Sequence, residues 1–311
     1  MTRAATGTGK YEALLERCRA LAPVPTAVAH PCEESALTGA VEAAEQGLIK
    51  PILVGPAARI REIAESARVN LKGIEIVDAP HSVAAAEQAL ALVREGKAEV
   101  LMKGSLHTDE LLGAVVSREK GLRTGRRISH VFIMDVPTYH KVLVVTDAAI
   151  NIAPVLEDKA DIVQNAIDLA ITLGVEKPKV AILAAVETIN SKMPATLDAA
   201  ALCKMADRGQ IKGGLLDGPL AFDNAISKDA AKTKGIKSDV AGDPDILLAP
   251  DLEAGNILAK QLSFLANADS AGLVLGAKVP IILTSRADSV RSRIASCGVA
   301  ALVAHARRSK P

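Results

Sequence analysis

The residues with the clearest chemical meaning are Ser285 and Arg286, which lie between an apolar strand pattern and a predicted helix over Ala287–Val303. The first turn of a helix presents unpaired N–H groups and a partial positive charge, and an adjacent guanidinium can bind two oxygens of one phosphate. This spacing predicts an anion site. A second interpretation stays open, in which Asp288 or Ser289 only caps the helix and Arg286 is a solvated charge.

Polar residues also follow four other predicted strands, and ligands of open α/β sheets bind beyond the carboxyl ends of strands. These positions are Lys103-Gly104-Ser105, Asp147 with Asn151, Asp217-Gly218-Pro219, and Asp251 with Gly255 and Asn256. Glycine at such a place lets the backbone approach a ligand closely. An ordinary turn would also explain the Asp-Gly-Pro segment, and helix caps would explain the other acidic and amide side chains.

The elements that must position these residues alternate along the whole chain. Short apolar runs alternate with longer amphipathic segments, which is typical of a parallel sheet wrapped by helices and predicts an α/β fold. Helices are predicted over Asp158–Leu173, from its 3.6-residue apolar period, and over Ser82–Glu95, with Ser82 as the cap. The predicted strands are Pro25–His30, Pro51–Gly55, Ile74–Asp78, Val100–Gly104, His130–Asp135, Val142–Thr146, Val180–Ala184, Gly214–Asp217, Ile246–Pro250, Gly272–Gly276 and Pro280–Thr284.

Composition and charge exclude several classes of protein. The 311 residues include 37 Lys and Arg against 36 Asp and Glu, a net charge of +1, which argues against nucleic acid as a partner. Hydrophobic residues make up 49% of the chain, which excludes intrinsic disorder and provides a sizeable core in about two domains. Aromatic residues make up only 2%, so the core is expected to consist of Ala, Val, Ile and Leu.

The cysteines and the N-terminal residues indicate which structural sites and which cellular location to expect. The four cysteines are scattered without a C-x-x-C pair, which argues against a structural zinc site and a disulfide framework. No apolar run approaches the ~18 residues of a membrane span, and the N-terminal residues lack the apolar region of a signal peptide. We therefore expect a soluble, cytoplasmic protein with no membrane partner.

The strand-end motifs, taken in order, resemble those of the phosphotransacylase family, the phosphate acetyltransferases and phosphate butyryltransferases. The resemblance runs through most of the chain, and the joint order of the motifs makes it specific. The motifs are Leu101–Gly104, Gly121–Gly125, Ser129–Asp135, Thr146–Pro154, Leu216–Ala221, Ala241–Asp245, Ala249–Asn256 and Thr284–Ser289. The resemblance implies transfer of a short acyl group, acetyl or butyryl, between coenzyme A and inorganic phosphate, with no metal and no permanently bound cofactor.

The resemblance also implies an architecture. Members of this family have two α/β domains like those of isocitrate and isopropylmalate dehydrogenases, with the site in the cleft between them, and they are usually homodimers. The expected first domain comprises residues 1–145 plus 271–311, and the expected second domain comprises residues 146–270. Substrate contacts are expected at the strand-end positions, namely Lys103, Gly104, Asp147, Asn151, Asp217, Gly218, Pro219, Asp251, Asn256 and Ser289.

Catalytic roles follow from the resemblance residue by residue. Ser285 is expected to hydrogen-bond the reacting carbonyl, and Arg286 to hold phosphate and offset charge as the tetrahedral centre forms. A base must take the proton of the CoA thiol, because the thiolate is the nucleophile. Asp288 is the nearest carboxylate. The aspartate that acetyltransferases place further along this helix is missing, since residues Val290–Arg293 contain no carboxylate.

A second departure leaves two other functions open. Family members commonly carry an arginine in the helix after the Lys-Gly motif, where this chain has Asp109–Gly113. A relative that binds CoA without catalysis is therefore one alternative. The other is a metal- and NAD-dependent dehydrogenase of the same fold with Asp217, Asp243 or Asp251 as metal ligands, although no G-x-G-x-x-G segment follows a predicted strand.

Overall fold

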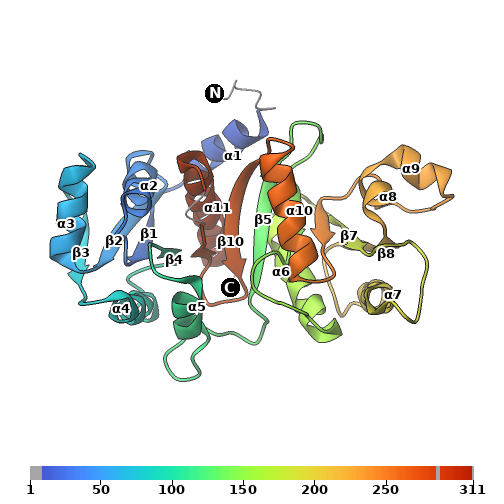
Figure 1. The fold of residues 1–311 in the computed structure, drawn as a ribbon, viewed down its shortest axis with the longest axis horizontal. Coiled ribbons are helices and arrows are strands. Elements are labelled where there is room, and N and C mark those ends of the chain that lie inside the picture. The colour runs from blue at the N-terminus through green and yellow to red at the C-terminus, as the bar shows by residue number, and fades with distance from the viewer. Residues whose placement is uncertain (1–8, 285–287, 310–311) are drawn as a thin grey trace. The chain divides into compact units, whose positions relative to one another are not determined.

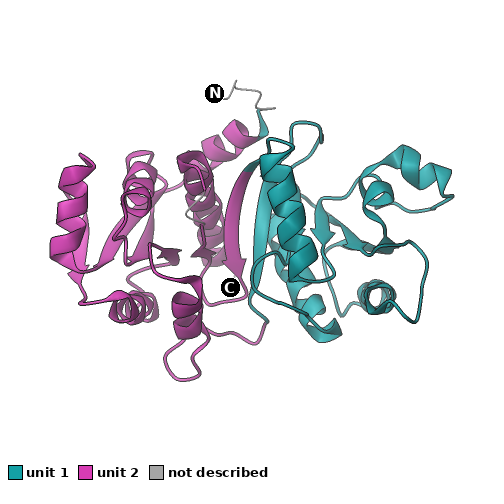
Figure 2. Ribbon diagram, in the orientation of Figure 1, with its two compact units in different colours: residues 1–10, 127–269 teal, residues 11–126, 270–311 magenta. Residues whose placement is uncertain are grey.

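The computed structural model describes residues 9–284 and 288–309, and its contacts divide the chain into two compact units (Figure 2). Unit 1 comprises residues 1–10 and 127–269, and unit 2 comprises residues 11–126 and 270–311. The chain therefore leaves unit 2 after Arg126 and returns to it at Ser270. Within the described ranges, none of the helices combines the length and the apolar character needed to cross a membrane.

The strands of unit 2 follow the order β3-β2-β1-β4-β11-β10. All neighbouring pairs are parallel except β10 and β11, which run antiparallel. The register pairs Ala29 of β1 with Lys103 of β4, and Met102 of β4 with Ile282 of β11, so the carboxyl ends of these three strands lie at one edge of the sheet. The bounds are β1 (Val24–Ala29), β2 (Ile49–Gly55), β3 (Glu75–Asp78), β4 (Val100–Lys103), β10 (Asp269–Leu275) and β11 (Ile281–Ile282).

Helices cover both faces of this sheet (Figure 1). On one face α2 packs against α3 and α11, and on the other α4 packs against α5. The stretch Arg293–Ala304 of α11 is buried throughout, which its Ala, Gly and Ser residues allow because they occupy little volume. The helices are α1 (Lys10–Arg19), α2 (Glu34–Glu45), α3 (Ala57–Ser66), α4 (Ser82–Arg94), α5 (Thr108–Val116) and α11 (Val290–Arg308).

The strands of unit 1 follow the order β5-β6-β9-β7-β8. β5 is antiparallel to β6, and the remaining pairs are parallel, so the carboxyl ends of β6 and β9 lie together. Aliphatic side chains such as Met134, Val145, Leu220 and Leu247 fill the core. The bounds are β5 (Ser129–Asp135), β6 (Leu143–Thr146), β7 (Lys179–Leu183), β8 (Leu215–Leu220) and β9 (Ile246–Leu248).

The helices of unit 1 also divide between two faces. α6 packs against β6, β9 and α7 on one side, whereas α10 contacts β5 and β6, and α8 contacts β7 and α9. The apolar stripe that predicted α6 is buried, including Ile162, Ala166 and Ile167. The helices are α6 (Leu156–Thr172), α7 (Pro194–Asp207), α8 (Phe222–Ile226), α9 (Lys228–Thr233) and α10 (Leu252–Phe264).

Each predicted strand has a counterpart in the structure, and the α/β prediction is confirmed. The cap of α4 was predicted wrongly: His81 caps this helix, accepting a hydrogen bond from the Ala84 N–H, while the Ser82 hydroxyl donates to Glu110. α11 begins at Val290, after the predicted start. The division into domains at 145/146 and 270/271 stays a prediction, and the contact units change at 126/127 because β5 pairs with β6.

Candidate active site

The carboxyl end of β4 is held tightly against the end of β1. The backbone N–H of Gly104 donates to the carbonyl oxygen of Ala29 at 2.8 Å. A Cβ atom at position 104 would lie closer than 3.0 Å to the carbonyl oxygens of both Ala29 and His30, so only glycine fits here. Lys103, the last residue of β4, is buried, and its Nζ donates to the Gly104 carbonyl oxygen at 3.3 Å.

A hydrogen-bonded cluster joins His30 to the same strand end. Ser105 Oγ donates to the His30 carbonyl oxygen at 2.8 Å and lies 3.2 Å from the ring Nδ1 of His30. The backbone N–H of Cys32 donates to the same Oγ at 3.1 Å. His30 has a φ of 54°, a left-handed conformation that these contacts stabilise. Burial lowers the pKa of His30, against the opposing effect of the Glu110 and Glu33 charges, so the ring is neutral at pH 7.

His30 was not among the candidate residues predicted from the sequence. The predicted strand Pro25–His30 includes His30 as its final residue, whereas β1 ends at Ala29. His30 is therefore the first residue beyond the strand, which is the position where ligands of α/β sheets are bound. The rule that singled out Lys103 would have found His30 as well, had the strand been ended one residue earlier.

The sequence after β11 contains the two residues with the clearest predicted chemistry, Ser285 and Arg286, and both lie outside the described residues. Ser289, just beyond them, is the N-cap of α11, because its Oγ accepts a hydrogen bond from the backbone N–H of Ser292 at 3.1 Å. The capping interpretation is therefore right for Ser289. Its predicted contact with substrate stays a prediction.

A buried guanidinium lies just beyond the end of β11. The side chain of Arg293 is 3% exposed, and its Nη1 donates to the Thr284 hydroxyl at 2.9 Å. Burial lowers the pKa of Arg293, and the nearby charges of Asp288 and Glu33 act in the opposite direction. Glu33 thus influences both Arg293 and His30. The strand ends of unit 2 therefore bring together an imidazole, a buried guanidinium and carboxylates.

In unit 1, Asp147 is buried directly after β6 and closes a turn of backbone. Its carboxylate accepts hydrogen bonds from the backbone N–H groups of Ala149, Ile150 and Asn151 at 2.9, 3.1 and 3.2 Å. The Asn151 side-chain amide also donates to Asp147, and its oxygen accepts from Arg127 Nε at 2.7 Å. Asp147 and Asn151 are paired as predicted, and their side chains stabilise the backbone of this turn.

The start of α10 packs on the same turn. Asp251 is the N-cap of this helix, because its carboxylate accepts from the Ala254 N–H at 2.9 Å. The Asn256 side chain donates to the Ala148 carbonyl oxygen at 2.9 Å. A Cβ at Gly255 would lie closer than 3.0 Å to the Asp147 carbonyl oxygen, so this glycine is required by packing. The structure thus brings the predicted residues after β6 and β9 together.

The Asp-Gly-Pro segment lies inside strand β8 and does not form the turn that the sequence suggested. β8 is the terminal strand of the unit 1 order, where a proline can be accommodated because one side of the strand needs no ladder hydrogen bonds. The register with β7 shifts between Ala181 and Leu183, opposite this segment. Asp217 accepts from the Gly218 N–H at 2.8 Å, and β7 separates this segment from β9.

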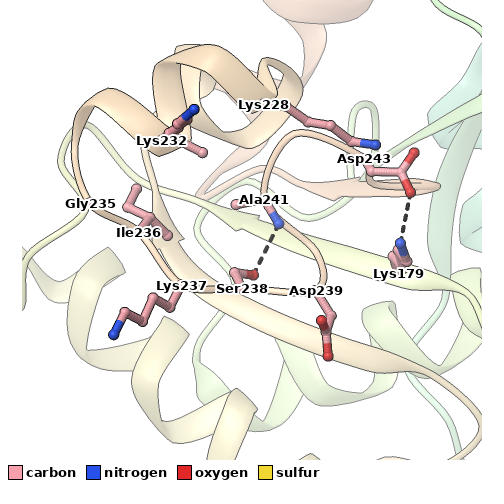
Figure 3. A pocket seen from close by; sticks show the side chains of 11 residues that line it. Lys179, Lys228, Lys232, Gly235, Ile236, Lys237, Ser238, Asp239, Ala241 and Asp243 are labelled. Carbon is pink, nitrogen blue, oxygen red and sulfur yellow. Dashed lines mark hydrogen bonds and ion pairs between the residues drawn. The ribbon is translucent and has the colours of Figure 1, made fainter.

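A pocket of about 520 Å³ lies at the other end of the unit 1 sheet, where β7 and β9 begin (Figure 3). It is lined by Lys179, Lys228, Lys232 and Lys237 together with Asp243. Lys179 donates to the Asp243 carboxylate at 2.7 Å. Burial raises the pKa of Asp243, but hydrogen bonds from Lys179, Lys141 and His140 outweigh it and hold this pKa well below its ordinary value.

This arrangement does not provide the metal site that a dehydrogenase of this fold would need. Asp243 precedes β9 and Asp251 follows it, so the two carboxylates lie at opposite ends of one strand. A metal ion needs its carboxylate ligands within about 2.0–2.6 Å. Over the described part of the chain, no three His, Cys, Asp or Glu side chains are grouped as metal ligands.

Comparison with known proteins decides between the open functions. The family model described as phosphate acetyl/butaryl transferase matches residues 82–301, more than half of the chain. The chain belongs to this family. A phosphate acetyltransferase of Rhizobium meliloti is 64% identical to the enzyme over 300 residues, which cover 96% of this chain and 95% of the relative. The enzyme is therefore a phosphate acyltransferase, and the dehydrogenase alternative is not supported.

Solved structures agree with this assignment and with the fold. The crystal structure of a branched-chain phosphotransacylase from Enterococcus faecalis V583 matches with a TM-score of 0.79 and 30% identity, covering 91% of this chain and 99% of that one. A 4-hydroxythreonine-4-phosphate dehydrogenase structure from Salmonella typhimurium matches with a TM-score of 0.58 at 12% identity, covering 91% of this chain and all of the other. The second likeness concerns the fold alone and confirms a dehydrogenase-like architecture.

Proposed function

We propose that the enzyme transfers an acetyl group between coenzyme A and inorganic phosphate, converting acetyl-CoA and phosphate to acetyl phosphate and CoA. The observation that carries this proposal is the 64% identity to a phosphate acetyltransferase across nearly the whole of both chains. A phosphate butyryltransferase of Clostridium acetobutylicum is less similar, at 44% identity, and the branched-chain phosphotransacylase is less similar still, at 30% identity. Acetyl is therefore the preferred acyl group, ahead of butyryl and branched groups.

The residues proposed to catalyse this reaction follow β11 in the sequence of unit 2. Arg286 holds phosphate, and Ser285 hydrogen-bonds the acyl carbonyl as it becomes tetrahedral. The buried Lys103 places a positive charge at the end of β4, which pairs with β11, the strand that precedes Ser285 in the sequence. Asp288 carries a negative charge near Arg293 and completes the set of predicted catalytic residues.

The unit 1 residues predicted to bind substrate contribute through the backbone that they shape. Asp147, Asn151, Asp251 and Asn256 hold the turn after β6 against the start of α10. Such a turn can present N–H and carbonyl groups to the substrate, since its own side chains are engaged in holding it. Asp217, Gly218 and Pro219 form a separate candidate contact within β8.

The test is release of free CoA thiol from acetyl-CoA, propionyl-CoA and butyryl-CoA in the presence of phosphate or arsenate, without added metal. We expect release that depends on the anion and is fastest with acetyl-CoA. Faster turnover of butyryl-CoA would contradict the acyl preference and leave the reaction intact. Binding of CoA without thiol release would identify a catalytically silent relative and overturn the proposed reaction.

We further propose that the enzyme is a cytoplasmic homodimer that uses an apolar stripe of α10. Ile257, Phe264 and Leu265 are 57%, 70% and 81% exposed, and Phe264 lies two helical turns after Ile257 on the same face. Exposed apolar side chains gathered on one face are typical of a protein interface. Light scattering should give the mass of a dimer, and Phe264→Glu should reduce it to that of a monomer, whereas an unchanged mass would place the interface elsewhere.

A further inference from the structure

The proposed reaction requires a group that accepts a proton. The aspartate that acetyltransferases place along the last helix is missing from this chain. In the direction that consumes acetyl phosphate, the CoA thiol must lose its proton before or while sulfur attacks the acyl carbon, because the thiolate is the nucleophile. An ordinary thiol has a pKa of about 8.5, an imidazole about 6.5 and an aspartate about 3.9. The pKa of an imidazole is closer to that of the thiol than the pKa of a carboxylate is, so an imidazole is the better-matched base.

The hydrogen bonds around His30 fix which nitrogen of its ring carries the proton. A serine hydroxyl has one proton and two lone pairs. The Ser105 hydroxyl donates its one proton to the His30 carbonyl oxygen at 2.8 Å and accepts the Cys32 N–H, so it has no second proton to donate to the His30 ring at 3.2 Å. Nδ1 must therefore be the donor in this contact. The neutral ring then has its lone pair on Nε2, which accepts no hydrogen bond within the described ranges.

Burial keeps the ring of His30 neutral, and the carboxylates near it leave it able to take up a proton. Burial lowers its pKa, and the positive charge that His81 can carry acts in the same direction. Glu110 and Glu33 act in the opposite direction, and they would stabilise an imidazolium once it forms. Glu33 is also near Arg293, the arginine that donates to Thr284, which directly precedes Ser285 in the sequence.

The position of His30 in the sheet places it with the rest of the predicted catalytic group. It follows β1, whose neighbour in the sheet is β4, and β11 pairs with the other side of β4. All three strands are parallel, so His30, Lys103 and Thr284 lie at the same edge of unit 2. Ligands of α/β sheets are bound at this edge.

We propose that Nε2 of His30 is the base that takes the thiol proton of coenzyme A, with Ser105 as the residue that positions it. The S–H proton moves to Nε2 while the sulfur–carbon bond forms, and the carbon–oxygen bond to phosphate breaks with its electron pair leaving on phosphate. In the opposite direction the imidazolium returns the proton to the departing thiolate. Asp288 then serves as a counter-charge for Arg293. This inference rests on the proposed acyl transfer.

His30→Asn is the variant that isolates Nε2. Asparagine tolerates a left-handed conformation, and its side-chain amide can replace Nδ1 as a donor to Ser105 while leaving nothing at the place of Nε2. We expect kcat for acetyl-CoA formation from acetyl phosphate to fall about 100- to 10,000-fold, the range typical of a lost general base. His305→Gln is the matched control, because His305 lies at the end of α11 and bonds the Ala22 carbonyl oxygen.

The pH profile separates a catalytic role from a structural one. Because the pKa of His30 is lowered, the acid limb of kcat/KM for the wild-type enzyme should lie below about pH 6.5, with activity rising as the pH rises through it. This limb should disappear in His30→Asn, and the variant should recover part of its rate as the pH approaches the thiol pKa. A folded variant with wild-type kcat and an unchanged limb would overturn the proposal.

Ser105→Ala tests the positioning without removing the base. We expect a smaller loss of kcat than for His30→Asn, and nitrogen NMR of the wild-type ring should show the proton on Nδ1 at pH 7.5, with a mixture of tautomers in the variant. A wild-type ring protonated on Nε2 would also overturn the proposal, even if His30→Asn does not fold. Failure of the wild-type enzyme to release thiol from any acyl-CoA would instead overturn the acyl transfer itself.

Discussion

Unit 1 and unit 2 both place polar residues beyond the carboxyl ends of parallel strands, but the two groups have different partners. After β6 and β9 of unit 1, Asp147 and Asp251 accept hydrogen bonds from backbone N–H groups. After β1 of unit 2, backbone and Ser105 contacts leave the Nε2 of His30 with its lone pair. Position at a strand end therefore marks a candidate residue, and the hydrogen-bond partners decide whether it holds the backbone or is available for chemistry.

After His30→Asn, the largest effect on turnover is expected from Arg286→Ala, which tests whether unit 2 carries the chemistry. Loss of a group that stabilises developing charge costs about 100- to 1,000-fold in kcat, so turnover with phosphate should fall by that factor while the circular dichroism spectrum stays unchanged. Arg291→Ala is the matched control. Arg291 is paired with Glu12 and lies over the Tyr11 ring, so its loss should leave the phosphate kinetics intact. Equal losses in both variants would contradict the assignment of phosphate binding to Arg286.

Gly104→Ala should have the next largest effect, and it acts on folding. A methyl group at this position meets the carbonyl oxygens of Ala29 and His30, so we expect a loss of about 3 kcal/mol or more of unfolding free energy in urea. Gly113→Ala is the control, because Gly113 lies within α5 with no atom near its missing Cβ. That change should stabilise the enzyme by about 0.5–1 kcal/mol. If both variants lose unfolding free energy, or both gain it, the packing argument is wrong.

In unit 1, Asp147→Ala should cost more stability than Asp251→Ala. The first change removes the acceptor of three backbone N–H groups, and we expect about 2–3 kcal/mol from groups left unsatisfied. The second removes one helix cap, worth about 1 kcal/mol. Urea unfolding measures both. If Asp147→Ala unfolds like the wild type and instead raises KM for CoA, then Asp147 contacts the substrate directly.

The smallest effect is a pH dependence of stability in unit 1. Hydrogen-bonded ion pairs with Lys179 and Lys141 outweigh burial and hold the pKa of Asp243 well below its ordinary value, so their stabilisation is present above about pH 4 and is lost progressively as the pH falls below about 4 towards that lowered pKa. We expect about 1 kcal/mol or less. Urea unfolding at pH 7 and pH 3.5 should show a smaller difference for Asp243→Asn than for the wild type. An equal difference would assign the pH dependence to other carboxylates.

Much of the fold could be predicted from the sequence because buried strands are uniform apolar runs. All the predicted strands are present, but the runs carry no direction, so the antiparallel pairs β5–β6 and β10–β11 could not be foreseen. The cap of α4 was assigned one residue late for a related reason: His81 and Ser82 are both polar, and only the hydrogen bond to the Ala84 N–H distinguishes them.

The roles of the candidate site residues were harder to predict, because each role depends on contacts with residues that are distant in the sequence. His30 and Ser105 are separated by 75 positions, and nothing local to either indicates that one fixes the tautomer of the other. Asp217-Gly218-Pro219 has the composition of a turn, yet pairing with β7 keeps it in a strand. In both cases a tertiary contact overrides the local pattern.

The late return of the chain to unit 2 has a consequence for how the enzyme matures on the ribosome. Translation delivers β1 and β4 early and then the whole 127–269 segment, before β11 and α11 emerge. Domains tend to fold in the order of synthesis. Until residues 281–282 arrive, β4 lacks the strand that pairs with one of its edges, and Arg293 is not yet in place. The sheet of unit 2 is therefore completed only after β11 and α11 have been synthesised.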